Sequence, residues 1–152
     1  MSNSERALNP PKVAVGEIMT AGVHRVKPEM KVCEAIELLT QFQISGAPVV
    51  DNMDKVISIV SEGDLLRLAA SDGLEATIAS CLPKLPKTHR LVTVEKQHSF
   101  TDVYKLFLKH SLHRIMVVDG NGRLHGLVTR ADILRLFVEA RYGKKIRRPG
   151  AA

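Results

Sequence analysis

The sequence predicts an α/β (α+β) fold of two β-α-β-β-α repeats that pack sheet to sheet in one pseudo-two-fold globule. Residues 23–68 align with residues 91–136 without a gap at an offset of 68, and both stretches carry the same helix and strand pattern. The chain has 152 residues, of which 45% are hydrophobic and 25% charged. This length and composition suit a folded protein that buries a sizeable core.

Identical residues of the two repeats fall into blocks at fixed spacing. They are Val26/Val94, Leu38/Leu106, Val49/Val117, Val50/Val118, Asp51/Asp119, Val60/Val128, Asp64/Asp132, Leu66/Leu134, Arg67/Arg135 and Leu68/Leu136. The chain is therefore a tandem duplication. We expect a flexible arm over 1–12, repeat 1 over 13–70, a linker over 71–86, repeat 2 over 87–138 and a basic tail over 139–152.

Each repeat shows the same order of elements. Apolar residues at helical spacing over 32–39 and 100–108 predict a core-facing helix in each half. Buried strands are predicted at 48–50 and 115–118, followed by turn residues and second strands at 56–60 and 124–128. A second helix then begins after Ser61 in repeat 1 and after Thr129 in repeat 2.

The linker region is rich in residues that interrupt helices. Ser71-Asp72-Gly73 ends the preceding helix, and Pro83, Pro86 and the polar stretch 87–89 predict an extended lead-in to repeat 2. A unit this small has one sheet face and little core of its own, so the two halves are expected to pack together. The clefts between the halves are the expected ligand positions.

Charge and composition exclude several classes of protein. The net charge is +6, but the basic residues after 140 carry most of it, so the body is too balanced for a nucleic-acid groove. The chain has no apolar run long enough for a membrane span and starts with a polar segment, so we expect a cytoplasmic protein. Cys33 and Cys81 are expected to be reduced, and no residues show metal-ligand spacing.

Four segments resemble a known family. They are Val15-Gly16-Glu17-Ile18-Met19-Thr20, Ile44-Ser45-Gly46-Ala47-Pro48-Val49-Val50-Asp51, and the paired strand ends Ile59-Val60-Ser61-Glu62-Gly63-Asp64 and Gly126-Leu127-Val128-Thr129-Arg130-Ala131-Asp132. The chain resembles a tandem cystathionine β-synthase (CBS) domain pair, or Bateman module. Through residues 112–119 the second repeat also resembles a repeat of the AMP-activated kinase γ subunit. The resemblance covers about 13–138 and leaves no catalytic domain.

The repeated Ser/Thr-x-x-Asp pattern has two compatible interpretations. Ser61 and Thr129 can cap the helices that follow them, with Asp64 and Asp132 in the first turn. Alternatively, an aspartate at a helix start can accept hydrogen bonds from both ribose hydroxyls of a nucleoside. The resemblance favours ligand binding, because CBS pairs hold ribose at these positions.

The resemblance implies two pockets, each combining the aspartate of one half with a strand segment of the other. In the first, Thr129 and Asp132 hold ribose and phosphate. The adenine slot of this pocket is lined by Gly22, Ile44, Ser45 and Gly46. Its signature is complete, including Gly126, so we expect this pocket to be the main one.

In the second pocket, Ser61 and Asp64 hold ribose. Leu91 and Leu112 lie along the base, and His113 and Arg114 lie at the phosphate. Ser58 stands where the other half has Gly126 and is expected to crowd this pocket.

Without the resemblance, His113 and Arg114 are equally well interpreted as a surface pair at the start of a strand. His24-Arg25 is a similar dipeptide but aligns with Val92-Thr93, so it is read as strand edge.

The resulting hypothesis is a stand-alone CBS-pair regulatory protein that binds an adenine nucleotide and signals to an unidentified partner. AMP is the favoured ligand, with ADP, ATP, NAD and S-adenosylmethionine open. CBS pairs usually form homodimers, so a homodimer is expected. The chain has no G-x-S-x-G, P-loop, G-x-G-x-x-G or H-E-x-x-H motif, so it is not expected to be an enzyme. The alternative is a nucleic-acid-binding or protein-interaction scaffold that uses the basic tail.

Overall fold

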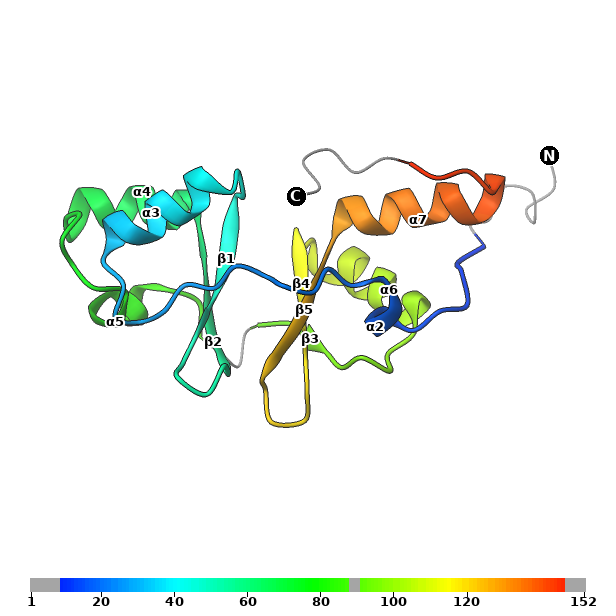
Figure 1. Ribbon diagram of the computed structural model, residues 1–152, viewed down its shortest axis with the longest axis horizontal. Coiled ribbons are helices and arrows are strands. Elements are labelled where there is room, and N and C mark those ends of the chain that lie inside the picture. The colour runs from blue at the N-terminus through cyan, green and yellow to red at the C-terminus, as the bar shows by residue number, and fades with distance from the viewer. Residues whose placement is uncertain (1–8, 88–90, 147–152) are drawn as a thin grey trace.

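The computed structural model describes residues 9–87 and 91–146. Parts of the predicted arm (1–8), the lead-in (88–90) and the tail (147–152) lie outside these residues. Figure 1 shows two similar halves whose β-hairpins lie together at the centre, with helices on the outer sides. The α+β fold with two packed repeats is confirmed. No helix among the described residues has the length and apolar character that crossing a bilayer requires.

The first half contains helix α3 (Val32–Gln41), strands β1 (Gly46–Val50) and β2 (Val56–Ser61), and helix α4 (Glu62–Ser71). The second half repeats this order with α6 (Phe100–His110), β4 (Arg114–Val118), β5 (Leu124–Thr129) and α7 (Arg130–Tyr142). The hairpins have equivalent registers: Gly46 pairs with Ser61, and Arg114 pairs with Thr129. The predicted helices and hairpins are therefore confirmed in both halves.

The leading strand differs between the halves. In the second half, β3 (Thr93–Val94) pairs in parallel with β4. In the first half it is reduced to a single parallel bridge between Val26 and Val49, held by hydrogen bonds from the Val26 amide to the Pro48 carbonyl (2.9 Å) and from the Val50 amide to the Val26 carbonyl (3.0 Å). His24 and Arg25, expected at a strand edge, lie just before this bridge.

The linker holds more structure than expected. Helix α5 (Ile78–Cys81) and the 3-10 helix η1 (Leu82–Lys84) occupy it, so Pro83 lies in a helical turn and the extended conformation expected there was wrong. Ile78 and Cys81 are three residues apart and are both buried in the first core, and Leu85 follows them. Burial of these apolar side chains explains why the segment turns. Cys33 and Cys81 are both free, as expected.

Three apolar clusters hold the molecule together. One lies in each half, and the third joins the two hairpins through Val50, Val56, Met116, Val118 and Leu124. The short helix α2 (Val15–Ile18) packs on the second half, where Val15 is fully buried and its amide donates to the His98 carbonyl at 2.7 Å. The N-terminal segment therefore packs on the second half. The domain boundaries predicted from the sequence stay a prediction.

Candidate functional site

The two repeated aspartates lie at equivalent helix starts. The Ser61 hydroxyl accepts from the Asp64 amide (3.1 Å), while Asp64 Oδ2 accepts from the Ser61 amide (2.9 Å). At α7 the Thr129 hydroxyl accepts from the Asp132 amide (3.2 Å), and Asp132 Oδ2 accepts from the Thr129 amide (2.9 Å). Both sites are capping boxes, so the capping interpretation is confirmed and uses one oxygen of each carboxylate.

The second carboxylate oxygen of each aspartate faces an arginine one turn along the helix. Asp64 Oδ1 lies 2.8 Å from Arg67 Nη2, and Asp132 Oδ1 lies 3.5 Å from Arg135 Nη2. The capping interpretation did not use these arginines, although the repeat alignment marks them as identical. In each aspartate, Oδ1 is thus the oxygen that the cap does not use.

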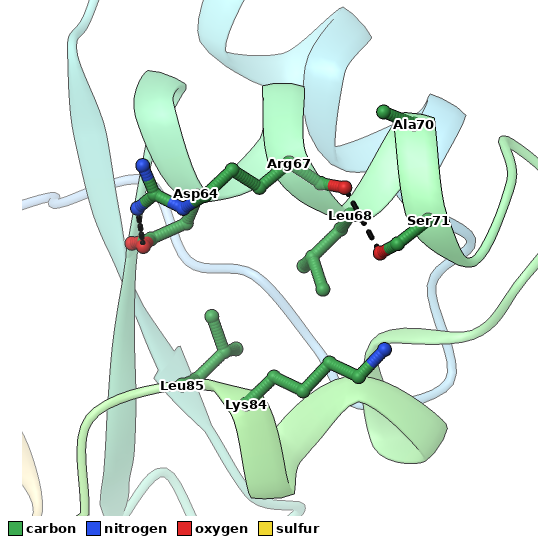
Figure 2. A pocket seen from close by; sticks show the side chains of 7 residues that line it. All are labelled: Asp64, Arg67, Leu68, Ala70, Ser71, Lys84 and Leu85. Carbon is green, nitrogen blue, oxygen red and sulfur yellow. Dashed lines mark hydrogen bonds and ion pairs between the residues drawn. The ribbon is translucent and has the colours of Figure 1, made fainter.

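Asp64 lines an open pocket of about 470 Å³ between α4 and η1. Figure 2 shows Leu68 of α4 and Leu85, just after η1, pointing toward each other across this pocket, with the Asp64–Arg67 ion pair at one end. Lys84, which pairs with Asp72 at 2.6 Å, lies on the η1 side. The pocket size falls in the range of small-molecule sites. Of the predicted site residues, only Asp64 lines it.

Arg114 connects the two halves at the start of the central strands. Its Nη2 donates to the Ser45 hydroxyl at 2.6 Å, and a Cβ placed on Gly46 would overlap its Nη1. Burial lowers the pKa of Arg114, which still stays charged at neutral pH. Gly46 is the register partner of Ser61, so the guanidinium lies one strand from the cap of α4. The sequence hypothesis placed Arg114 and Ser45 in different pockets, whereas the structure brings them into contact.

The other predicted site residues are more dispersed. Ile44 packs at the edge of the first core and Leu112 at the edge of the second. Leu91 borders the central cluster between the hairpins. His113 is exposed and accepts through Nδ1 from Arg130 Nη2 at 2.6 Å. Gly22 is exposed with a positive φ of 67° and follows the bridge between Thr20 and Leu127.

Ser58 and Gly126 occupy equivalent positions in the two repeats, but they contact the neighbouring chain segment in different ways. A Cβ at Gly126 would lie 2.5 Å from Met19 Sδ and 3.0 Å from the Thr20 carbonyl, so glycine admits the N-terminal segment. In the first half the buried Ser58 hydroxyl instead donates to the Pro86 carbonyl at 2.9 Å. Ser58 therefore binds the linker backbone through its side chain.

Within residues 9–87 and 91–146, no cluster of three or more histidine, cysteine, aspartate or glutamate side chains is placed to hold a metal ion. The donors and acceptors at the site are instead carboxylates, hydroxyls and guanidinium groups beside apolar walls. This set of groups suits an organic ligand with hydroxyl and anionic substituents.

Comparison with known families decides the identity of the fold. A family model described as the CBS domain matches residues 15–71 and again residues 86–139. This chain belongs to the CBS domain family. Because the model matches each half in turn, the chain is a tandem CBS pair, as the sequence resemblance predicted.

Two plant proteins are among its relatives. The chloroplastic CBS domain-containing protein CBSX1 of Arabidopsis thaliana is 31% identical over 151 residues, with 82% of this chain and 64% of CBSX1 covered. The crystal structure of CBSX2 in complex with AMP matches with a TM-score of 0.73 at 28% identity, covering 85% of this chain and 98% of that one. CBSX2 is a CBS-pair protein from the same plant.

An enzyme also contains a matching region. Inosine-5′-monophosphate dehydrogenase of Aquifex aeolicus is 29% identical over 110 residues, which cover 72% of this chain but 21% of the enzyme. This chain therefore matches a minor part of that enzyme, and it spans 64% of the length of CBSX1. CBS pairs thus occur both in an enzyme and in proteins named for their CBS domains.

Proposed function

We propose that this CBS pair binds an adenine nucleotide between its two halves and transmits the bound state to a partner protein. The observation that carries the proposal is the pair of equivalent helix-start aspartates, each with one oxygen in a cap and the other turned toward an arginine. The crystal structure of the related CBSX2 in complex with AMP supports this ligand class. AMP is the favoured ligand, followed by ADP, ATP, NAD and S-adenosylmethionine.

The proposed mechanism is regulatory rather than catalytic. Residues from both halves meet at Arg114 and Ser45, one strand from the cap of α4, so a ligand that contacts both Asp64 and this pair favours one arrangement of the halves. A partner that binds this arrangement better is then favoured by the ligand to the same extent. Location in the cytoplasm stays a prediction from the sequence.

A thermal-shift screen against these five ligands tests the proposal. A ligand at 100 times its Kd adds about 2.7 kcal/mol, or roughly 5–10 °C in Tm for a chain of this length. We expect the shift to be lost in whichever of Asp64→Asn and Asp132→Asn removes the aspartate of the occupied site, because asparagine keeps a cap acceptor but loses the charge that binds ribose.

Asp102→Asn is the matched control, because Asp102 also sits in a first helical turn behind a serine cap but belongs to α6. The Asp102→Asn variant should show the same ligand-induced increase in Tm as the unmodified protein. If the unmodified protein shows no shift with any of the five compounds, the proposed function is wrong.

A further inference from the structure

The two candidate sites differ one turn beyond Arg67 and Arg135, the arginines that are identical in the two repeats. On α4 the row facing the linker reads Asp64, Arg67, Ser71, and on α7 the equivalent row reads Asp132, Arg135, Glu139. Arg135 Nη1 donates to both oxygens of Glu139 at 3.2 and 3.3 Å. Arg67 has no carboxylate at the equivalent position, because Ser71 stands there and its hydroxyl donates to the Arg67 carbonyl at 3.0 Å.

This difference decides how free each guanidinium is. The side chain of Arg67 is 73% exposed and lines the open pocket, whereas that of Arg135 is 15% exposed between two carboxylates. An exposed ion pair is weak and is readily exchanged for another partner. A largely buried pair is costly to break, because it leaves an uncompensated charge. Arg67 is therefore available to a ligand, and Arg135 is held.

Glu139 is itself held in place by the end of the chain. The Ile146 amide donates to Glu139 Oε1 at 2.9 Å, after the left-handed Gly143 reverses the chain beyond α7. Figure 1 shows this red segment returning along α7. Lys145 also acts on Glu139, but it is exposed and its charge is screened by water. In the first half the chain instead enters the linker after Ser71, and its 3-10 helix η1 lies across the open pocket from α4.

Other charges near the helix starts face a different groove. Glu62 lines a pocket with α3 residues, and Arg130 lines the equivalent pocket with α6 residues. Residues two positions apart on a helix do not share a face, so Glu62 and Arg130 lie away from the rows that contain Asp64 and Asp132. These two charges therefore do not offset the difference made by Glu139.

We propose that Glu139 makes the two sites unequal, so that an adenine nucleotide with a 5′-phosphate binds at Asp64 in preference to Asp132. This inference rests on the proposed function and names Arg67 as a phosphate-binding residue. Ribose hydroxyls donate to Asp64 Oδ1 in place of Arg67, and the released guanidinium binds phosphate oxygens with its planar fork. At Asp132 the same exchange is blocked, because Glu139 keeps Arg135. The main site is then the one that sequence reasoning ranked second.

Calorimetric titration with AMP tests the choice of site. We expect about one AMP per chain, at least about tenfold weaker binding in Asp64→Asn, and less than about threefold change in Asp132→Asn. The reverse pattern, or two equal sites in the unmodified protein, would overturn the inference while leaving the proposed function intact. If AMP, ADP and ATP all fail to bind, the inference is wrong, and if NAD and S-adenosylmethionine fail as well, the proposed function is also wrong.

Substitutions that add a carboxylate at position 71 or remove it at position 139 test the role of Glu139 directly. Ser71→Glu should weaken AMP binding by about tenfold more than Ser71→Gln, which has the same size without the charge. Adenosine has no phosphate, so the two variants should bind it equally. Glu139→Gln keeps an acceptor for Ile146 but loses the carboxylate, and it should raise the number of bound AMP molecules toward two per chain. Equal AMP affinities for the two Ser71 variants would contradict the inference.

Discussion

Gly126 has a different role from the one that its place in the sequence motif suggested. Because Gly126 has no side chain, Met19 and the Thr20 carbonyl can lie close to its backbone. Beside it, Thr20 and Leu127 exchange backbone hydrogen bonds of 2.9 and 3.0 Å. Ser58 was expected to crowd the second pocket, but its hydroxyl binds the Pro86 carbonyl in the linker. Each residue thus fixes the position of the chain segment that enters its half.

Gly126→Ala should destabilise the protein. The added methyl group meets a backbone carbonyl that the Thr20–Leu127 bridge holds in place, and overpacking of this kind costs about 1–3 kcal/mol. The loss is measured as the free energy of unfolding in urea.

Gly63→Ala is the matched comparison. A Cβ there meets nothing closer than 3.6 Å, and Gly63 lies within α4. Alanine should therefore stabilise the protein by about 0.5–1 kcal/mol through helix propensity. If the two substitutions change the free energy of unfolding equally, the contacts around position 126 do not exclude a methyl group.

Some of these side-chain roles were visible in the sequence and others were not. The capping boxes were predictable, because a cap joins residues three positions apart. The contact between Arg114 and Ser45 joins residues 69 positions apart, and local pattern does not contain it. The roles of Arg67 and Arg135 depend on Ser71 and Glu139, which differ between the repeats. An alignment that searches for identity passes over such a difference.

Helix α7 and the segment that follows it form one unit. The sequence predicted that the basic tail begins at 139, but α7 continues to Tyr142 and residues 143–146 return along it. The hydrogen bond from the Ile146 amide, together with the Arg135 pair, lowers the pKa of Glu139 from its ordinary value of 4.5. The folded state therefore favours the charged carboxylate.

The stabilising contribution of the Glu139 charge should disappear in acid. A lowered pKa in the folded state adds stability above pH 4.5 and loses it as the pH falls through the folded-state value. Urea unfolding of the unmodified protein and Glu139→Gln should therefore differ most near pH 7 and converge near pH 3. A difference that stays constant over this range would contradict the assignment.

The order of elements was more predictable than the details of the connections. Helices α3, α4, α6 and α7 and both hairpins have clear periodicity because each buries one face. The leading strand of the first half is a single bridge at Val26, which is too short for a pattern to identify. Helix α5 contributes Ile78 and Cys81 to the core, yet two apolar residues among proline and polar residues do not predict a helix.

At the scale of the whole molecule, large apolar side chains remain exposed on the helices. Leu66, Leu108 and Leu134 are 73%, 75% and 67% exposed, and Leu66 and Leu134 occupy equivalent positions in equivalent grooves. Burial of a leucine contributes about 1.5–3 kcal/mol. These side chains support the expected homodimer, which stays a prediction.

Light scattering coupled to size exclusion should give the mass of a dimer. Leu66→Glu combined with Leu134→Glu should give a monomer with an unchanged circular dichroism spectrum, because a buried unpaired charge opposes association. Met53→Glu is the control, since Met53 is 55% exposed at a hairpin turn, and it should leave the dimer intact. A monomeric unmodified protein would contradict the expectation.

The Gly46–Arg114 contact has an evolutionary consequence. Residues 46 and 114 are equivalent positions of the two repeats, yet the Arg114 guanidinium occupies the space that a side chain at 46 would need. A symmetric pair of identical single repeats would carry the same residue at both positions, either two glycines without the arginine or two arginines competing for one space. The contact therefore requires repeats that have diverged, which places its origin after the duplication that joined them in one chain.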